Sequence, residues 1–265
     1  CGMPTILIKN KDGNIVELDS NNPPINKYTS KLVSHEYSLS NINSMIIYSD
    51  GLVESYTQKK RLYTNEIRFD FLASAFYSEF ENIFTEKMPT LSDDLTIFYL
   101  KRLCADKIWE INSQISTKLD ELNSFLESVE GQLNRKGIKD ELISKIKVSA
   151  YELLMNAYEH GNLGIDMEQK HRLIKNNLYD KYLKDSENSC KKVIKIKYGI
   201  YIVDDIEVFG FSVTDEGDGF SINISNRALE NTEYYCGRGI VLSSLFADSL
   251  HYNIKGNESS FYIKI

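Results

Sequence analysis

This 265-residue sequence has no long apolar run, no excess of basic charge, and few cysteines or prolines. Its best apolar run, at residues 45–48, stops at Ser49 and Asp50, far short of the roughly 18 residues that cross a bilayer. The first residues do not resemble a secretory signal peptide. We therefore expect no membrane partner.

Basic residues are outnumbered in this chain. The 31 Lys and Arg residues face 38 Asp and Glu residues, which gives a net charge of −7, and both halves of the chain are mildly acidic. Binding to a nucleic-acid backbone depends on concentrated basic charge. Nucleic acid is therefore not an expected partner.

Cysteine is scarce and scattered. Cys1, Cys104, Cys190 and Cys236 form no CxxC pair and have no His-rich segment beside them, so no zinc site is expected. Scattered single cysteines are typical of a reduced, cytoplasmic protein. With 42% hydrophobic residues, four prolines and 14 glycines, the chain is neither disordered nor fibrous, and it accommodates one large or two ordinary domains.

The first hundred residues read mainly as strands and turns, with a domain boundary expected near Cys104. An Asp-Gly step at residues 11–14 predicts a hairpin. The expected elements are strands at 5–9, 15–18, 44–48 and 95–100 and a helix over 62–83.

Residues 105–265 form the second predicted domain. The 3,4 spacing of apolar residues predicts an amphipathic helix at 116–135. A second helix should end near His160–Asn162 and bury, on one face, Ile143, Ile146, Ala150, Leu153 and Ala157. A polar helical insert is expected at 163–190, and strands at 108–115, 193–202, 207–214 and 249–254, with 261–265 as an edge. This order predicts an α/β sandwich, with helices on one face of a mixed sheet, and an α+β chain overall.

Helical spacing places Glu152 and Asn156 one turn apart on one face of the second helix, roughly opposite its apolar stripe. A carboxylate and a carboxamide stacked in this way can hold a divalent cation and polarise a nearby water or hydroxyl. A solvated helix face is the plain alternative for this pair.

Two glycine-containing segments follow. In the first, Asp215–Phe220, an acidic residue ends an apolar strand, and Gly217 and Gly219 allow a tight turn and close approach of a ligand. A carboxylate there can accept a hydrogen bond from an exocyclic amine such as that of adenine. The second, Gly237–Ile240, leads into a predicted helix whose N-terminus suits phosphate. The chain contains no GxxxxGK pattern followed by Ser or Thr, which excludes the usual phosphate-loop NTPases.

In this order, Glu152–Asn162, Asp215–Phe220 and Gly237–Ile240 resemble the asparagine box and two glycine boxes of the GHKL (Bergerat-fold) ATPases, especially the bacterial anti-sigma-factor serine kinases. The resemblance covers about residues 107–265. It implies Glu152 as the general base, Asn156 as a magnesium ligand and Asp215 as the carboxylate that reads adenine. The resemblance also implies ATP and Mg²⁺ as cofactors, and a lid formed by residues 221–236. The further nucleotide-binding residues that it implies are Gly217, Gly219, Gly237, Arg238, Gly239 and Ser259.

The first 104 residues carry a second resemblance. Gly2–Ile8, Tyr48–Glu54 and Ser92–Thr96 are similar to the C-terminal half of the PPM-type, sporulation-protein-E-like serine/threonine phosphatases, which implies part of a β-sandwich. Asp50 and Asp93 match metal ligands of that family's two-metal centre, which takes Mn²⁺ or Mg²⁺. The family's earlier metal-binding segment has no counterpart here and the chain does not start with Met, so we expect a truncated, inactive phosphatase domain.

These resemblances imply an ATP-dependent serine/threonine kinase of partner-switching signalling. Its expected substrate is a serine or threonine of a STAS-type anti-sigma antagonist, with a sigma factor as a further partner, and a homodimer is compatible with the apolar helix surfaces. A non-catalytic, ATP-gated module that controls the phosphatase is the alternative, although pure binding needs no base. A third interpretation is that the phosphatase is the main activity and the ATP-binding domain regulates it. A two-component histidine kinase is disfavoured, because residues 116–135 contain no histidine to accept phosphate.

Overall fold

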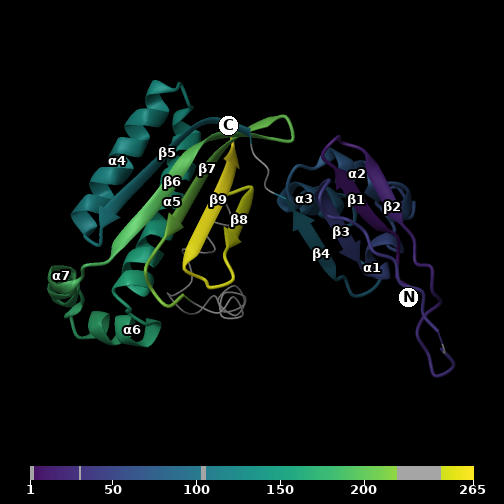
Figure 1. Ribbon diagram of the computed structural model, residues 1–265, viewed down its shortest axis with the longest axis horizontal. Coiled ribbons are helices and arrows are strands. Elements are labelled where there is room, and N and C mark those ends of the chain that lie inside the picture. The colour runs from purple at the N-terminus through teal and green to yellow at the C-terminus, as the bar shows by residue number, and fades with distance from the viewer. Residues whose placement is uncertain (1–2, 30, 103–105, 220–245) are drawn as a thin grey trace. The chain divides into compact units, whose positions relative to one another are not determined.

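The computed structural model describes residues 3–29, 31–102, 106–219 and 246–265. The chain divides into two compact units, Cys1–Ala105 and Asp106–Ile265. Each unit has its own antiparallel sheet and its own helices (Figure 1).

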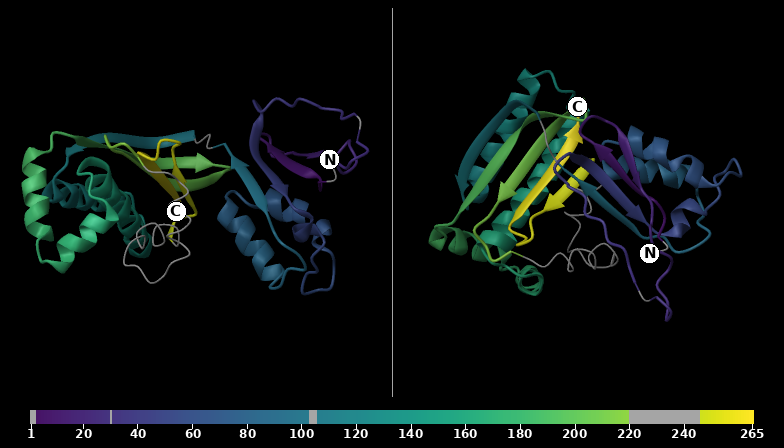
Figure 2. Two further views of the ribbon diagram at one scale, coloured as in Figure 1. Left: turned by 90° about the horizontal axis from the view of Figure 1, so that it is seen from below. Right: turned by 45° about the vertical axis from the view of Figure 1, so that its right-hand side comes forward.

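The first unit is built on a four-stranded sheet in the order β2-β1-β3-β4. Its strands are β1 (Ile6–Asn10), β2 (Ile15–Leu18), β3 (Ile42–Tyr48) and β4 (Ile97–Lys101). The predicted hairpin is confirmed, because β1 pairs with β2 and Gly13 turns the chain with a φ of 76°. One face of the sheet packs on helices (Figure 2), namely α1 (Asp50–Val53), the 3₁₀ turn η1 (Tyr63–Asn65), α2 (Ile67–Ala73) and α3 (Tyr77–Lys87).

The single helix expected over 62–83 is wrong, because the chain breaks between α2 and α3. Ser74 is extended, with a ψ of 129°, and the backbone N–H groups of Ala75 and Phe76 donate to the Glu79 carboxylate at 2.7 and 3.2 Å. This side chain satisfies the donors that a helix start leaves free, so it begins α3. The break lets Phe71 of α2 and Phe80 of α3 meet edge to face in the core.

The second unit is built on a five-stranded sheet in the order β5-β6-β7-β9-β8. Its strands are β5 (Asp106–Ser116), β6 (Val193–Val203), β7 (Ile206–Thr214), β8 (Ser249–Tyr252) and β9 (Glu258–Lys264). The helices α4 (Leu119–Arg135) and α5 (Asp140–Asn156) cover one face of this sheet (Figures 1 and 2). A π-helical turn η2 (Ala157–Asn162) extends α5, and the insert folds into α6 (Met167–Lys175) and α7 (Tyr179–Ser189).

Two expectations for this sheet are corrected. Every neighbouring pair of strands is antiparallel, so the sheet is not mixed. The last strand is not an edge, because β9 lies between β7 and β8. The physical reason is that β9 buries Phe261 and Ile263 in the core, whereas no residue of the shorter β8 is fully buried. The strand with more apolar surface to bury takes the inner position.

The core of the second unit lies between the sheet and the two covering helices. The predicted apolar face of α5 is confirmed, since Ile143, Ile146, Ala150, Leu153 and Ala157 are all buried. Stacked rings of Phe209, Phe211 and Phe261 form the sheet side of this core. Across the described ranges of both units, no helix is both long and apolar enough to cross a bilayer.

Candidate functional site

The polar side of α5 carries the predicted pair Glu152 and Asn156. Both are half-buried, whereas Leu153 and Ala157, which follow them in sequence, are packed in the core. The helix therefore divides as the sequence predicted, with an apolar side on the sheet and a polar side that carries Glu152 and Asn156.

The helix changes its winding directly after Asn156. In η2 the N–H of Leu163 donates to the Tyr158 carbonyl five residues earlier, at 3.0 Å. π-helical turns of this kind occur frequently at functional sites. Here the turn buries Glu159 and brings Gly161 against the end of β7.

Asp215 follows the last residue of β7, and its carboxylate lies against Gly161. A β-carbon on Gly161 would be 2.3 Å from the Cγ atom of Asp215, so no other residue fits there without movement. The N–H of Gly217 donates to Asp215 Oδ1 at 2.8 Å. Burial raises the pKa of Asp215, against the opposing effects of this hydrogen bond and of Lys192 and Lys255.

The glycines after Asp215 are held by close backbone packing. A β-carbon on Gly217 would be 2.4 Å from the Gly161 carbonyl oxygen, and one on Gly219, whose φ is 81°, would be 1.9 Å from the Lys255 carbonyl oxygen. Both positions therefore require glycine. The backbone of this segment therefore stays bare beside the Asp215 carboxylate.

The turn between β8 and β9 supports the Asp215 segment from the other side. The Asn253 side chain accepts from the N–H groups of Gly256, Asn257 and Glu258 at 2.7, 3.1 and 3.2 Å, which fixes the turn. Asn257 then pairs with Asp215 twice: the Asp215 N–H donates to its carbonyl, and its side-chain amide donates to the Asp215 carbonyl, both at 3.0 Å. The position of Asp215 thus depends on a turn 42 residues away.

Asn162 joins this segment to the rest of the unit, a role that the sequence did not reveal. Its side chain is 4% exposed and donates to Thr117 Oγ1 and to the Val193 carbonyl at 2.8 and 3.0 Å. Its Oδ1 accepts from the N–H of Glu216 at 2.8 Å. One amide therefore ties the Asp215 segment to Thr117, directly after β5, and to β6.

Ser259 faces the same side of the sheet as Asp215. It pairs with Val213 in β7 and lies two residues before the buried Phe261, so strand alternation places it on the helix-covered face. The remaining predicted nucleotide-binding residues, Gly237, Arg238 and Gly239, and the predicted lid at 221–236 lie outside the described residues.

A second acidic group, also missed from the sequence, lies near Glu152. Glu159 accepts from Lys170 Nζ of α6 and from the Tyr179 hydroxyl of α7. Burial raises the pKa of Glu152, Lys170 opposes this rise, and the negative charge of Glu159 adds to it. The sequence signal that could have pointed to Glu159 was its spacing of seven residues from Glu152, which is close to two helical turns. Nothing in the neighbouring sequence indicates that the insert supplies the partners of Glu159.

In the first unit, Asp50 and Asp93 lie on neighbouring turns. A β-carbon on Gly51 would be 3.1 Å from the Asp93 carbonyl oxygen and 2.4 Å from that of Asp94, so the two backbones touch. Both side chains are exposed. No group of three or more His, Cys, Asp or Glu side chains that could hold a metal occurs in the described part of the chain. These residues alone do not fit a two-metal centre, so we derive no hydrolytic step from them.

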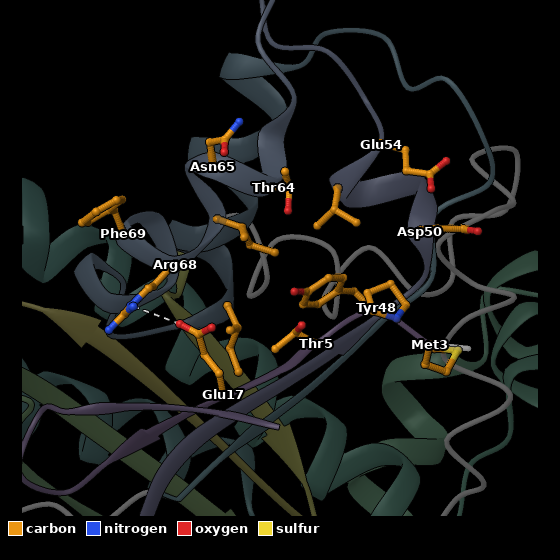
Figure 3. A pocket seen from close by; sticks show the side chains of 14 residues that line it. Met3, Thr5, Glu17, Tyr48, Asp50, Glu54, Thr64, Asn65, Arg68 and Phe69 are labelled. Atoms are coloured by element: carbon orange, nitrogen blue, oxygen red, sulfur yellow. Dashed lines mark ion pairs between the residues drawn. The ribbon is translucent and has the colours of Figure 1, made fainter. Parts of the chain in front are cut away.

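Asp50 also borders a pocket of about 550 Å³ within the first unit (Figure 3). Asp50 of α1 and Glu54, which follows that helix, lie on one side of it, and Glu17 and Arg68 lie on the other, joined by an ion pair of 3.0 Å. The acidic residues of this pocket are therefore spread over its rim and do not converge on one point.

Two family models match this chain. Residues 115–262 match the model of the histidine kinase-like ATPase domain, which covers Glu152, Asn156, Asp215 and the glycines around them. This chain belongs to that family. Residues 1–103 match the model of stage II sporulation protein E (SpoIIE).

The chain is thus a histidine kinase-like ATPase domain fused behind a SpoIIE-like segment, as both sequence resemblances implied. No curated protein matches it. Among solved structures, one of the RsbU and RsbW domains of a Mycobacterium tuberculosis protein is similar to the whole chain, with 15% sequence identity and a TM-score of 0.34. The chain spans 64% of the length of that structure.

Proposed function

We propose that residues 106–265 bind Mg·ATP and transfer its terminal phosphate to a serine or threonine of a STAS-type anti-sigma antagonist, with a sigma factor as a further partner. The observation that carries this proposal is the contact of the Asp215 carboxylate with Gly161, at the end of the helix that carries Glu152 and Asn156. This contact supports the proposal because it joins the Asp215 segment to the turn that extends α5, the helix that carries the two residues proposed for metal binding and proton transfer.

Each described residue has a distinct part in this proposal. Asp215 accepts a hydrogen bond from the adenine amine, and Gly217 and Gly219 let the nucleotide approach the backbone. The side-chain oxygen of Asn156 would hold Mg²⁺, which when bound neutralises phosphate charge. Glu152 accepts the proton of the attacking hydroxyl, and its raised pKa brings it closer to the pH at which a base works best.

Nucleotide binding is tested by calorimetry with and without Mg²⁺ on the wild type and on Asp215→Asn. The substitution removes a charged hydrogen bond worth roughly 1.5–3 kcal/mol, so ATP affinity should fall about ten- to a hundredfold. Asp218→Asn is the matched control, because Asp218 is an exposed acid in the same segment and should bind ATP as the wild type does. Equal ATP affinity in Asp215→Asn and the wild type would remove the adenine assignment.

Phosphoryl transfer is tested separately, with radiolabelled ATP and a candidate anti-sigma antagonist. Glu152→Gln should bind ATP almost as tightly as the wild type but transfer phosphate about 10²–10⁴ times more slowly. Asn156→Ala should instead lose Mg-dependent affinity as well as turnover. If the wild type binds ATP and modifies no antagonist, an ATP-gated binding module is the better account of this domain.

A further inference from the structure

The pocket of the first unit has the size and enclosure of a site for a small molecule. Its volume is about 550 Å³, which is typical of small-molecule pockets. Strands β1, β2 and β3 line it from one side, and α1, η1 and α2 line it from the other. Asp93, the second residue matched to a phosphatase metal ligand, is not among the lining residues. The pocket is therefore distinct from the place where Asp50 and Asp93 approach each other.

The floor of the pocket is apolar except for one hydroxyl group. Leu7 and Ile67 are each 3% exposed, and Tyr48 is 4% exposed. The Tyr48 hydroxyl points into the pocket between its two sides (Figure 3). Among the residues that the structure describes, none forms a hydrogen bond with this hydroxyl. Because buried hydroxyl groups are normally paired, an unpaired one that points into a cavity marks the place of a polar group of a ligand.

The rim of the pocket carries separated negative charges. Asp50 and Glu54 lie on one side, and Glu17 lies on the opposite side in its ion pair with Arg68. Three carboxylates and one guanidinium leave the lining with two net negative charges. Since these carboxylates do not converge, they suit a ligand with several positive groups along its length better than a single metal ion.

We propose that this pocket binds a linear aliphatic polyamine, a chain with an ammonium group at each end and one inside. The end groups pair with the carboxylates on the two sides of the rim, and the internal ammonium donates to the Tyr48 hydroxyl. The methylene groups lie on Leu7 and Ile67, and the rings of Tyr48 and Phe69 attract the cationic groups. The site belongs to the first unit alone and does not depend on the function proposed for the second.

The ligand is tested by calorimetry on the full chain, without nucleotide or metal, with spermidine as the probe. Octamethylenediamine is the matched ligand, because it has the same length and the same two end groups but no internal ammonium. It should bind about tenfold more weakly, the lower end of the effect of a hydrogen bond to a charged group. Nα-Acetyl-lysine amide represents a lysine side chain of a partner protein, and with one ammonium group it should bind more weakly still. Equal affinity for this compound and spermidine would overturn a site with several cation positions.

The role of the floor is tested with Tyr48→Phe, which keeps the ring and removes only the hydroxyl. Spermidine affinity should fall about tenfold, because the internal ammonium loses its acceptor. Octamethylenediamine affinity should stay as in the wild type, since this ligand has no internal group to donate. An equal loss for both ligands would show that the substitution changes the shape of the pocket, and it would overturn the proposed place of the internal ammonium.

The role of the rim is tested with charge variants. Glu54→Gln should weaken spermidine binding about fivefold, as expected for one exposed ion pair. Arg68→Gln should tighten binding by a similar factor, because it frees Glu17 from its ion pair. Glu86→Gln is the matched control, since Glu86 is an exposed acid outside the pocket lining and its loss changes the net charge equally.

The rim variants also decide the proposal if Tyr48→Phe does not fold. If Glu54→Gln and Glu86→Gln weaken binding equally, spermidine is attracted only by the net negative charge of the chain, and the proposed site is wrong. A loss of affinity in Arg68→Gln would likewise contradict it, because a cationic ligand gains from the removal of a positive charge.

Discussion

The Asp215 carboxylate lies against Gly161, so closely that a β-carbon on Gly161 would be 2.3 Å from the Asp215 Cγ atom. The two residues are 54 positions apart and come from different elements, the π-helical turn after α5 and the end of β7. A contact this tight means that the identity of residue 161 sets the position of the Asp215 side chain.

Gly161→Ala should therefore weaken ATP binding even though Gly161 supplies no side chain of its own. The methyl group would displace Asp215 and with it the hydrogen bond proposed to adenine, which should lower affinity by about ten- to a hundredfold in calorimetry. Combined with Asp215→Asn, it should cause little further loss, because both changes remove one interaction. Gly131→Ala in α4 is the control, since a β-carbon there has nothing within 4 Å and should stabilise the helix by up to about 1 kcal/mol. Additive losses in the double variant would contradict the shared mechanism.

Glu152→Gln should make the protein more stable at neutral pH. Burial raises the folded-state pKa of Glu152, so protonation favours the folded chain. The contribution of Glu152 is fully present below its unfolded pKa, about 4.3, and is lost as the pH rises through its higher folded pKa. The two proteins should therefore have equal free energies of unfolding in urea at low pH. As the pH rises, the free energy of unfolding of Glu152→Gln should become larger than that of the wild type.

Glu141→Gln is the opposite control for this measurement. The hydrogen bond from Lys145 lowers the pKa of Glu141, so its contribution is present above its unfolded pKa and is lost as the pH falls. Its replacement should not stabilise the protein at neutral pH. A neutral-pH gain of equal size in both variants would show that the effect of Glu152 comes from net charge and not from burial.

Replacement of Asn162 should disturb both stability and the site. Asn162→Leu leaves the N–H of Glu216 without its acceptor and removes the donors to Thr117 Oγ1 and the Val193 carbonyl, which should cost roughly 1–3 kcal/mol in urea unfolding. Asn162→Asp keeps an acceptor for Glu216 but sets a buried carboxylate oxygen against the Val193 carbonyl, so its loss at neutral pH should be at least as large. ATP affinity should fall in both, because the Asp215 segment is no longer tied to Thr117 and to β6. Wild-type stability of Asn162→Leu would show that water replaces these bonds.

The first unit should show no Mn²⁺-dependent phosphatase activity in this chain. Asp50 and Asp93 are two carboxylates on neighbouring turns, whereas a two-metal centre needs more ligands to hold both ions. The assay is phosphate release from a phosphoserine protein with Mn²⁺ or Mg²⁺ present. Hydrolysis that disappears in Asp50→Ala would refute this prediction.

The sequence located the second unit's polar residues because their signals are local. The four-residue spacing of Glu152 and Asn156 follows from the helical period, and the buried stripe on the opposite side of α5 confirms that period. The need for glycine at 217 and 219 was likewise evident next to an acidic residue at the end of an apolar strand, and close backbone packing explains it. The roles of these residues in nucleotide binding and transfer remain predictions.

Only the tertiary structure decided which distant residues support the polar residues of the second unit. The pairing of Asp215 with Asn257, the attachment of Asn162 to two strands and the Lys170–Glu159–Tyr179 network join segments up to 54 residues apart. The break at Ser74 also depends on the tertiary structure, because the Glu79 side chain caps the helix that follows it. The inner position of β9 depends on the apolar area that this strand buries against α4 and α5. Periodicity reports which side of an element is buried, but contacts between elements depend on the whole fold, because each is selected by the packing and hydrogen bonding of all its neighbours at once.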